Sequence, residues 1–217
     1  MEIISVNPSK PDLNLVQKAA DIILNNGVIG YPTETVYGLG ANALNDVAVE
    51  KVFQLKRRER NKPILIISSD IEQVKKLIFS FPVTAEILAK HFWPGPITMV
   101  FKATSNLPER LLGGSLRIGI RIPDNKICLE LLRRCGVPIT STSANISGQK
   151  NPISAQEVSK NFGDKLDLII DGGRSPSRVP STVVAVDNDR ITLIREGAIP
   201  KQQIEQAIGN LTNEKKQ

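Results

Sequence analysis

Cysteine and histidine are scarce in this 217-residue sequence, which contains two cysteines and one histidine. A structural zinc site needs four ligands at recognisable spacings, and Cys128, Cys135 and His91 show no such pattern. A chain of this length buries roughly two thirds of the surface that its unfolded form exposes, so it needs no disulfides for stability. We therefore expect no metal site, two reduced thiols and a cytoplasmic protein.

Aromatic residues and long apolar runs are also few. Phe, Trp and Tyr together make up 4% of the sequence, which disfavours a nucleic-acid binder built on base stacking. No stretch approaches the roughly 20 apolar residues that a membrane-spanning helix requires. The first residues lack the basic and then apolar order of a signal peptide. We therefore expect no membrane partner.

Acidic residues are outnumbered, since 22 Asp and Glu stand against 28 Lys and Arg, giving a net charge of +6. Excess positive charge favours anionic partners such as nucleotides, nucleic acids or phosphorylated metabolites. With 41% hydrophobic and 23% charged residues, the composition otherwise matches an ordinary folded domain. Net charge alone does not choose among these partners.

Helical and strand patterns alternate along most of the sequence. Asp12 precedes a helical apolar stripe over residues 13–24, and residues 28–31 form an apolar run typical of a buried strand. Residues 182–186 and 191–195 flank a polar turn, which predicts a hairpin. Because helical crossovers join parallel strands and hairpins join antiparallel ones, we expect an α/β fold, a single domain with a twisted mixed sheet flanked by helices.

No linker or internal repeat divides the sequence. A last helical pattern covers residues 200–208, and the polar segment GNLTNEKKQ that follows is typical of a frayed end. We therefore expect one domain over residues 1–208 and a polar tail over residues 209–217.

A dense basic cluster follows the second helical pattern, with five cations within seven positions: Lys56, Arg57, Arg58, Arg60 and Lys62. One interpretation is a solvated helix end, where cations complement the helix dipole. The other is a phosphate clamp, because the apolar strand that follows brings the cluster to a sheet end, where α/β folds place ligands. The residues alone leave both open.

Hydroxyl residues are concentrated in TSTSANISG, residues 140–148, directly after a predicted strand. Small hydroxyl side chains let backbone amides approach an anion, although such residues also favour plain turns. Arg117, Arg121 and Arg195 lie at predicted strand ends. We find no nucleophile with its own base, because His91 sits in an amphipathic helix. The remaining chemistry is positioning and charge neutralisation, which phosphoryl and nucleotidyl transfer require.

Seven segments taken together resemble the YrdC-like family of L-threonylcarbamoyladenylate synthases. They are YPTETVYGLG (31–40), KRRERNKP (56–63), FWPGPIT (92–98), GIRIPD (119–124), TSANISG (142–148), PSTVV (180–184) and IREG (194–197). The resemblance implies a single twisted α/β domain with a large electropositive concave cavity. It also implies that L-threonine, bicarbonate and ATP are converted to threonylcarbamoyl-AMP and pyrophosphate, for N6-threonylcarbamoyladenosine modification of tRNA.

The resemblance also assigns roles to residues that match the family's motifs. For threonine and its carbamate they are Thr35, Arg121, Ser141 and Ser181. For ATP they are Arg58, Lys62, Arg117, Ser143, Asn145, Asn151 and Arg195. Lys56 and Arg58 are the expected catalytic residues. With Mg²⁺ carried on the ATP phosphates, they would neutralise charge on the departing pyrophosphate.

The family further implies partners in tRNA modification, either tRNA itself or separate transferase proteins. One alternative is a non-catalytic RNA-binding module that uses the same basic cavity, which would show a steep salt dependence and form no adenylate. A second is a carbamoyl-transfer domain like that of hydrogenase maturation factors, but the zinc-finger and acylphosphatase-like segments of those proteins are missing here.

Overall fold

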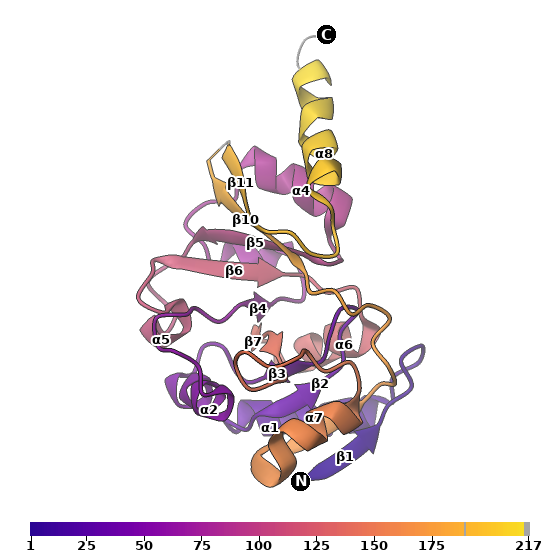
Figure 1. Cartoon of the computed structure of the whole chain (residues 1–217). Coiled ribbons are helices and arrows are strands. Elements are labelled where there is room, and N and C mark those ends of the chain that lie inside the picture. The colour runs from indigo at the N-terminus through magenta and orange to yellow at the C-terminus, as the bar shows by residue number, and fades with distance from the viewer. Residues whose placement is uncertain (189, 215–217) are drawn as a thin grey trace.

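The structure is a computed structural model that describes residues 1–188 and 190–214 (Figure 1). Its strands are β1 (Glu2–Ser5), β2 (Ile29–Tyr31), β3 (Gly38–Gly40), β4 (Ile66–Ile67), β5 (Ile97–Lys102), β6 (Arg117–Arg121), β7 (Ile139–Thr140), β8 (Thr142–Ser143), β9 (Leu168–Asp171), β10 (Thr182–Asp187) and β11 (Arg190–Arg195). Its helices are α1 (Leu13–Leu24), α2 (Asp46–Lys56), α3 (Ile71–Lys75), α4 (Val83–Phe92), α5 (Glu109–Leu112), α6 (Lys126–Cys135), α7 (Ala155–Phe162), the 3-10 helix η1 (Gly163–Lys165) and α8 (Lys201–Glu214).

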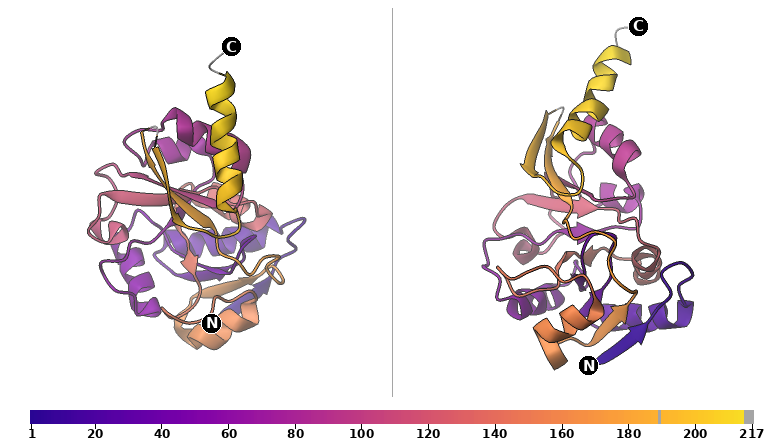
Figure 2. Two further views of the ribbon diagram at one scale, coloured as in Figure 1. Left: turned by 45° about the horizontal axis from the view of Figure 1, so that its top comes forward. Right: turned by 45° about the vertical axis from the view of Figure 1, so that its right-hand side comes forward.

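The strands form two mixed sheets, one of five strands in the order β1-β9-β2-β3-β8 and one of six in the order β11-β10-β5-β6-β4-β7. Strand β10 pairs in parallel with β5 and antiparallel with β11, so the predicted hairpin is confirmed. Figures 1 and 2 show the six-stranded sheet above the five-stranded one, with helices around both. The predicted α/β fold with mixed strands flanked by helices is therefore confirmed.

The mixed strands divide into two sheets, and Thr140 lies where they divide. The sheets nearly join where the isolated bridge between Asn42 and Ile139 links the end of β3 to β7. There the hydroxyl of Thr140 accepts the backbone N–H of Ala41 at 3.0 Å and donates to the carbonyl of Leu39 at 2.9 Å. The Thr140 side chain thus takes two backbone groups that a continuous ladder would use, and only an isolated bridge, with the Thr140 N–H donating to the Ala41 carbonyl at 2.9 Å, still links the two sheets.

Helix α1 begins where the sequence predicts, because the Asp12 carboxylate caps it by accepting the backbone N–H of Asn14 at 2.8 Å. The apolar stripe of α1 packs with α6 against the five-stranded sheet, in a core that includes Val16, Ile23 and Leu131. A larger core fills the rest of the molecule. Burial of these apolar faces fixes both sheets in place.

Helix α8 extends from Lys201 to Glu214, so helical structure continues past residue 208, where the sequence suggests a frayed end. Residues 215–217 of the predicted tail lie outside the described residues. The helix packs against α4, with Ile204 and Ala207 buried, and rises from the top of the molecule in Figure 1. Over residues 1–188 and 190–214, no helix combines the length and apolar character needed to cross a membrane.

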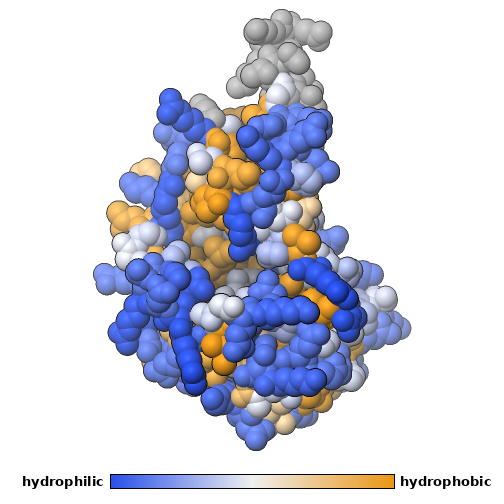
Figure 3. Space-filling view, in the orientation of Figure 1, coloured by the Kyte–Doolittle hydropathy of each residue, from blue (hydrophilic) through white to orange (hydrophobic). Residues whose placement is uncertain are grey.

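The molecular face seen in Figure 3 is mostly hydrophilic. Hydrophobic side chains gather over strands β10 and β11, where Ile194 is 57% exposed.

Gly113 offers a test of how the basic loop after α2 is supported. It ends α5 with a φ of 59°, and a Cβ added there would lie 2.6 Å from the backbone nitrogen of Pro63. We expect Gly113→Ala to lower the free energy of unfolding by about 2–3 kcal/mol in urea titrations, since a backbone clash adds to the left-handed strain. Gly136→Ala is the control, because Gly136 has a φ of 65° with open space around it. An equal loss of unfolding free energy in the two variants would contradict the predicted effect of the clash.

Candidate active site

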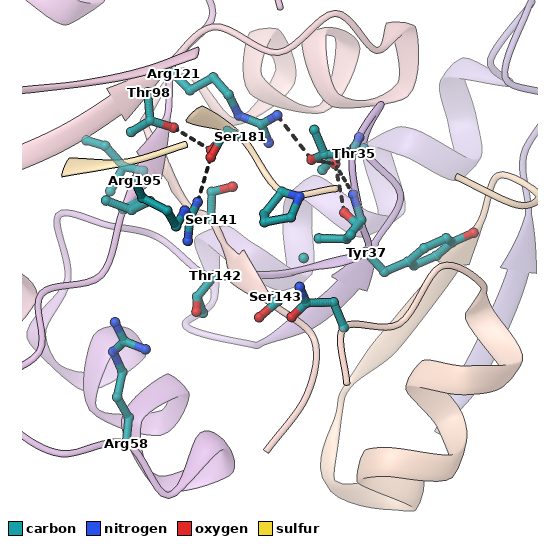
Figure 4. A pocket seen from close by; sticks show the side chains of 17 residues that line it. Thr35, Tyr37, Arg58, Thr98, Arg121, Ser141, Thr142, Ser143, Ser181 and Arg195 are labelled. Carbon is teal, nitrogen blue, oxygen red and sulfur yellow. Dashed lines mark hydrogen bonds between the residues drawn. The ribbon is translucent and has the colours of Figure 1, made fainter. Parts of the chain in front are cut away.

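A cavity of about 170 Å³ opens between the two sheets and gathers residues from all seven family-like segments (Figure 4). Eight predicted site residues line it: Thr35, Arg58, Arg121, Ser141, Ser143, Asn151, Ser181 and Arg195. Its described lining contains no Asp and no Glu. A cavity with three arginines and several hydroxyls, but without carboxylates, favours an anionic ligand.

The loop between β2 and β3 forms one wall and is shaped by the Thr33 hydroxyl. This oxygen accepts the backbone N–H groups of Thr35 and Val36 at 3.1 and 3.2 Å, and donates to the Val36 carbonyl at 2.7 Å. Both threonine side chains are buried, and their hydroxyls lie 2.9 Å apart. The turn therefore presents the Thr35 hydroxyl to the cavity in a fixed position.

Arg121 stands at the end of β6 and is 5% exposed. Its Nη1 donates to a carboxylate oxygen of Glu34 and to the Thr35 hydroxyl, the latter at 3.3 Å. A buried guanidinium requires charge and hydrogen-bond partners. Arg121 and Thr35, the two residues that the family resemblance assigns to the substrate threonine, therefore lie side by side in the cavity wall.

Ser181 and Arg195 form a second group beside Arg121 in Figure 4. The Ser181 hydroxyl lies 2.9 Å from that of Thr98, and Arg195 donates to the Ser181 carbonyl at 2.8 Å. Partial burial and the positive charge of Arg121 lower the pKa of Arg195. These two cations repel each other across the cavity, so a bound anion would relieve the repulsion.

Arg58 reaches the cavity from the opposite side, on the loop after α2 (Figure 4). Its guanidinium donates to the carbonyls of Lys62 and Pro63, at 3.1 and 2.8 Å, so its own loop holds it in place. Burial lowers the pKa of Arg58. Of the two interpretations of the basic cluster, the geometry of Arg58 matches a clamp, while the remaining cations of the cluster do not line the cavity.

Lys56, a predicted catalytic residue, does not line the cavity and is 2% exposed. Its ammonium donates to the Ser143 carbonyl, to the Asn145 carbonyl at 2.8 Å and to the Asn145 Oδ1 at 3.2 Å. Burial, with a contribution from the charge of Arg58, lowers the pKa of Lys56 to about 7. The ammonium therefore supports the 143–145 loop from behind, and the prediction that it contacts phosphates directly is not matched by the geometry.

Lys56 should also make stability depend on pH. Its pKa falls from 10.5 to about 7 on folding, so between these values the unfolded chain holds more protons and the free energy of unfolding rises with pH. Below pH 7 both states are protonated, and the contribution no longer changes. From pH 7 to 9, we expect the wild type to gain about 2 kcal/mol relative to Lys56→Met in urea unfolding. Parallel pH profiles for the two proteins would contradict the lowered pKa.

Three predicted ATP residues also lie away from the cavity. Arg117 shares a strand face with Arg121, but four residues of extended chain separate them by about 13 Å, and Arg117 pairs with Asp187. The Lys62 ammonium pairs with Glu59 at 2.6 Å in solvent. Asn145 is buried behind the cavity wall, where its Oδ1 accepts the Ser143 hydroxyl at 2.6 Å. The structure therefore does not bring these three side chains into the cavity, where ATP was predicted to bind.

Sequence reasoning missed several lining residues, namely Thr33, Val36, Tyr37, Gly38, Leu65, Ile66, Thr98, Thr142 and Pro180. Most belong to the seven family-like segments, so their position within those segments is a signal that sequence can use. Thr98 is the clearest omission, since it ends FWPGPIT and directly contacts Ser181. Tyr37 donates to the Gly173 carbonyl at 2.6 Å and so ties the cavity wall to the segment after β9.

Comparison with known proteins agrees with this architecture. The family model described as telomere recombination, for Sua5, YciO and YrdC proteins, matches residues 21–197. A threonylcarbamoyl-AMP synthase of Pyrococcus abyssi (strain GE5 / Orsay) is 40% identical over 90% of this chain and 58% of its own length. A threonylcarbamoyl-AMP synthase of Marinobacter nauticus is 32% identical, over 82% of this chain and 94% of its own.

A solved structure of P. abyssi Sua5 complexed with L-threonine superimposes with a TM-score of 0.93, at 39% identity over 96% of this chain and 61% of that chain. The fold and the cavity thus define an α/β protein with an arginine- and hydroxyl-lined cavity between two mixed sheets. The chain belongs to the Sua5/YciO/YrdC family. It spans a little over half the length of the curated relatives from P. abyssi and Bacillus subtilis.

Proposed function

We propose that the protein is an L-threonylcarbamoyladenylate synthase, a nucleotidyltransferase that makes threonylcarbamoyl-AMP, pyrophosphate and water from L-threonine, bicarbonate and ATP. Relatives at 32–40% identity carry the name threonylcarbamoyl-AMP synthase. The matching P. abyssi structure is a complex with L-threonine. The observation that carries the proposal is the convergence of Arg58, Arg121 and Arg195 on one carboxylate-free cavity. Such a cavity suits a triphosphate and an amino-acid carboxylate together.

The threonine end lies at the Thr33–Val36 turn. Arg121 binds the substrate carboxylate through its N–H groups, and the Thr35 hydroxyl lies 3.3 Å from the same guanidinium. Ser141 and Ser181 line the cavity next to this point and bind the carbamate. These contacts hold the nucleophilic oxygen in one orientation, which is the main source of rate in transfer reactions.

The nucleotide end lies between Arg58, Ser143 and Asn151, with Arg195 completing the wall. Arg58 neutralises charge on the β- and γ-phosphates, while Lys56 keeps the 143–145 loop in shape. The described lining offers hydroxyl, amide and backbone oxygens but no carboxylate. Mg²⁺ therefore enters as MgATP, held by the phosphates themselves.

The reaction begins when the threonine amine adds to carbon dioxide, formed from bicarbonate, and releases a proton. The carbamate oxygen then attacks the α-phosphorus of ATP, forming a P–O bond as the bond to pyrophosphate breaks. Arg58 stabilises the leaving group, and Arg121 keeps the carbamate aligned. The product passes to tRNA, or to a separate transferase protein that modifies tRNA, in the cytoplasm, where Cys128 and Cys135 remain free thiols.

The test is to incubate the purified chain with threonine, bicarbonate and MgATP, and to measure pyrophosphate release and threonylcarbamoyl-AMP by mass spectrometry. We expect both products, with pyrophosphate falling to background when threonine is omitted. A rate of pyrophosphate release that is the same with and without threonine would overturn the proposal. Salt-sensitive tRNA binding without adenylate formation would favour an RNA-binding module instead.

A further inference from the structure

Glu34 is a charged residue that the proposed mechanism leaves unused. It lies between two cavity-lining threonines, Thr33 and Thr35, but does not itself line the cavity. Its side chain is 13% exposed, and one carboxylate oxygen accepts from the Nη1 of Arg121. Its other oxygen, Oε2, is buried and has no hydrogen-bond partner among the described residues. A buried carboxylate with an unsatisfied oxygen is costly, so this pair calls for an explanation beyond simple packing.

We propose that Glu34 is a positioning residue for Arg121: it holds the guanidinium from behind, so that the free N–H groups of Arg121 face the cavity and bind one substrate carboxylate. This inference rests on the proposed function, in which that substrate is threonine. Within residues 1–188 and 190–214, Glu34 and Thr35 are the hydrogen-bond partners of the Arg121 side chain, and both engage Nη1. The Nε and Nη2 groups are therefore left for a ligand.

The pair also spans the boundary between the two sheets. Glu34 follows β2 of the five-stranded sheet, whereas Arg121 ends β6 of the six-stranded sheet. The Glu34 loop is held in turn by α6, where the Cys128 thiol donates to the Pro32 carbonyl at 3.0 Å. Glu34 thus fixes Arg121 relative to Thr35, which lies in the loop between β2 and β3 of the five-stranded sheet. This relative placement decides whether one substrate carboxylate can contact both residues.

Charge balance supports the same role. Arg195 is a neighbouring cation, and its pKa is lowered by burial first and by the charge of Arg121 second. Without Glu34, the Arg121 guanidinium would be buried beside another cation with no opposite charge among the described groups that contact it. Glu34 therefore stabilises Arg121 when no substrate is bound. With Glu34 in place, the two arginines carry one positive charge that remains unbalanced, which matches a single substrate carboxylate.

The test compares Glu34→Ala and Glu34→Gln with the wild type in steady-state kinetics and in threonine titration calorimetry. Glu34→Ala should raise the KM for threonine at least tenfold, while the KM for ATP stays within twofold. Glu34→Gln keeps an oxygen that can accept from Nη1, so it should restore part of the loss. Glu50→Ala is the control, because Glu50 is also a partly buried carboxylate paired with an arginine, Arg110, and neither residue lines the cavity. It should leave the KM for threonine within twofold.

A second measurement needs no substrate. In ¹⁵N-arginine spectra, the Arg121 side-chain N–H should exchange slowly in the wild type and at least tenfold faster in Glu34→Ala. Equal rises in both KM values, or an equal threonine effect in Glu50→Ala, would reduce Glu34 to a structural residue and overturn the proposal, as would unchanged Arg121 exchange. If the wild type neither binds threonine nor releases pyrophosphate, the proposed function fails. The exchange rates then still decide the positioning role.

Discussion

Replacing Arg121 with alanine should lower kcat/KM for threonine by about 100-fold or more in the pyrophosphate assay. Arg121 is 5% exposed and stands where Thr35 and Glu34 meet. Truncating one partner of a buried, hydrogen-bonded charge pair costs about 2–5 kcal/mol, which corresponds to roughly 30- to 5,000-fold. Because the proposed triphosphate site lies around Arg58, on the other side of the cavity, ATP binding should change much less.

Arg117→Ala is the matched control for this result. Arg117 lies on the same strand and the same face as Arg121, but it pairs with Asp187 outside the cavity. Its loss should leave kcat/KM for threonine within twofold, since exposed ion pairs contribute little. A fall in the Arg117 variant that matches the fall in the Arg121 variant would show that strand β6 acts only through stability.

Replacing Arg58 with alanine should weaken ATP binding by about 10- to 100-fold and leave threonine binding intact. A charge-assisted hydrogen bond to a phosphate is worth about 1.5–3 kcal/mol, and Arg58 is already held by the carbonyls of Lys62 and Pro63. Isothermal titration of each substrate separately measures the two affinities.

Lys62→Ala serves as the comparison for Arg58, because Lys62 belongs to the same basic cluster but pairs with Glu59 in solvent. We expect its effect on ATP affinity to be under threefold at physiological salt. Loss of threonine binding alone in Arg58→Ala would refute the division of the cavity into two ends.

Much of the fold follows from local patterns in the sequence. The Asp12 cap and the apolar stripe after it define α1, and the polar turn after residue 186 defines the hairpin of β10 and β11. The break between the sheets depends instead on where the Thr140 hydroxyl points, which only the folded chain determines. Residue type alone gives no reason to expect it, since threonine is also common within strands.

The candidate site likewise has features that the sequence predicts and features that only the folded structure reveals. Hydroxyls and arginines at strand ends were visible in the sequence, because strand ends meet at sheet edges. The roles of Lys56 and Glu34 were not, because their partners lie 87–89 residues away in the chain and depend on side-chain packing. The basic cluster predicts that each of its cations contacts a ligand, yet Lys56 is buried and supports a loop.

The order of strands in the two sheets has a consequence for how the protein is made. In the five-stranded sheet β9 lies between β1 and β2, and in the six-stranded sheet β10 pairs with β5. Neither sheet can be completed until residues 168–187 have left the ribosome. The cavity is completed later still, when Arg195 has been synthesised. Earlier strands remain without their neighbours during synthesis, so their edges are exposed to aggregation, and folding should be slow and dominated by long-range contacts.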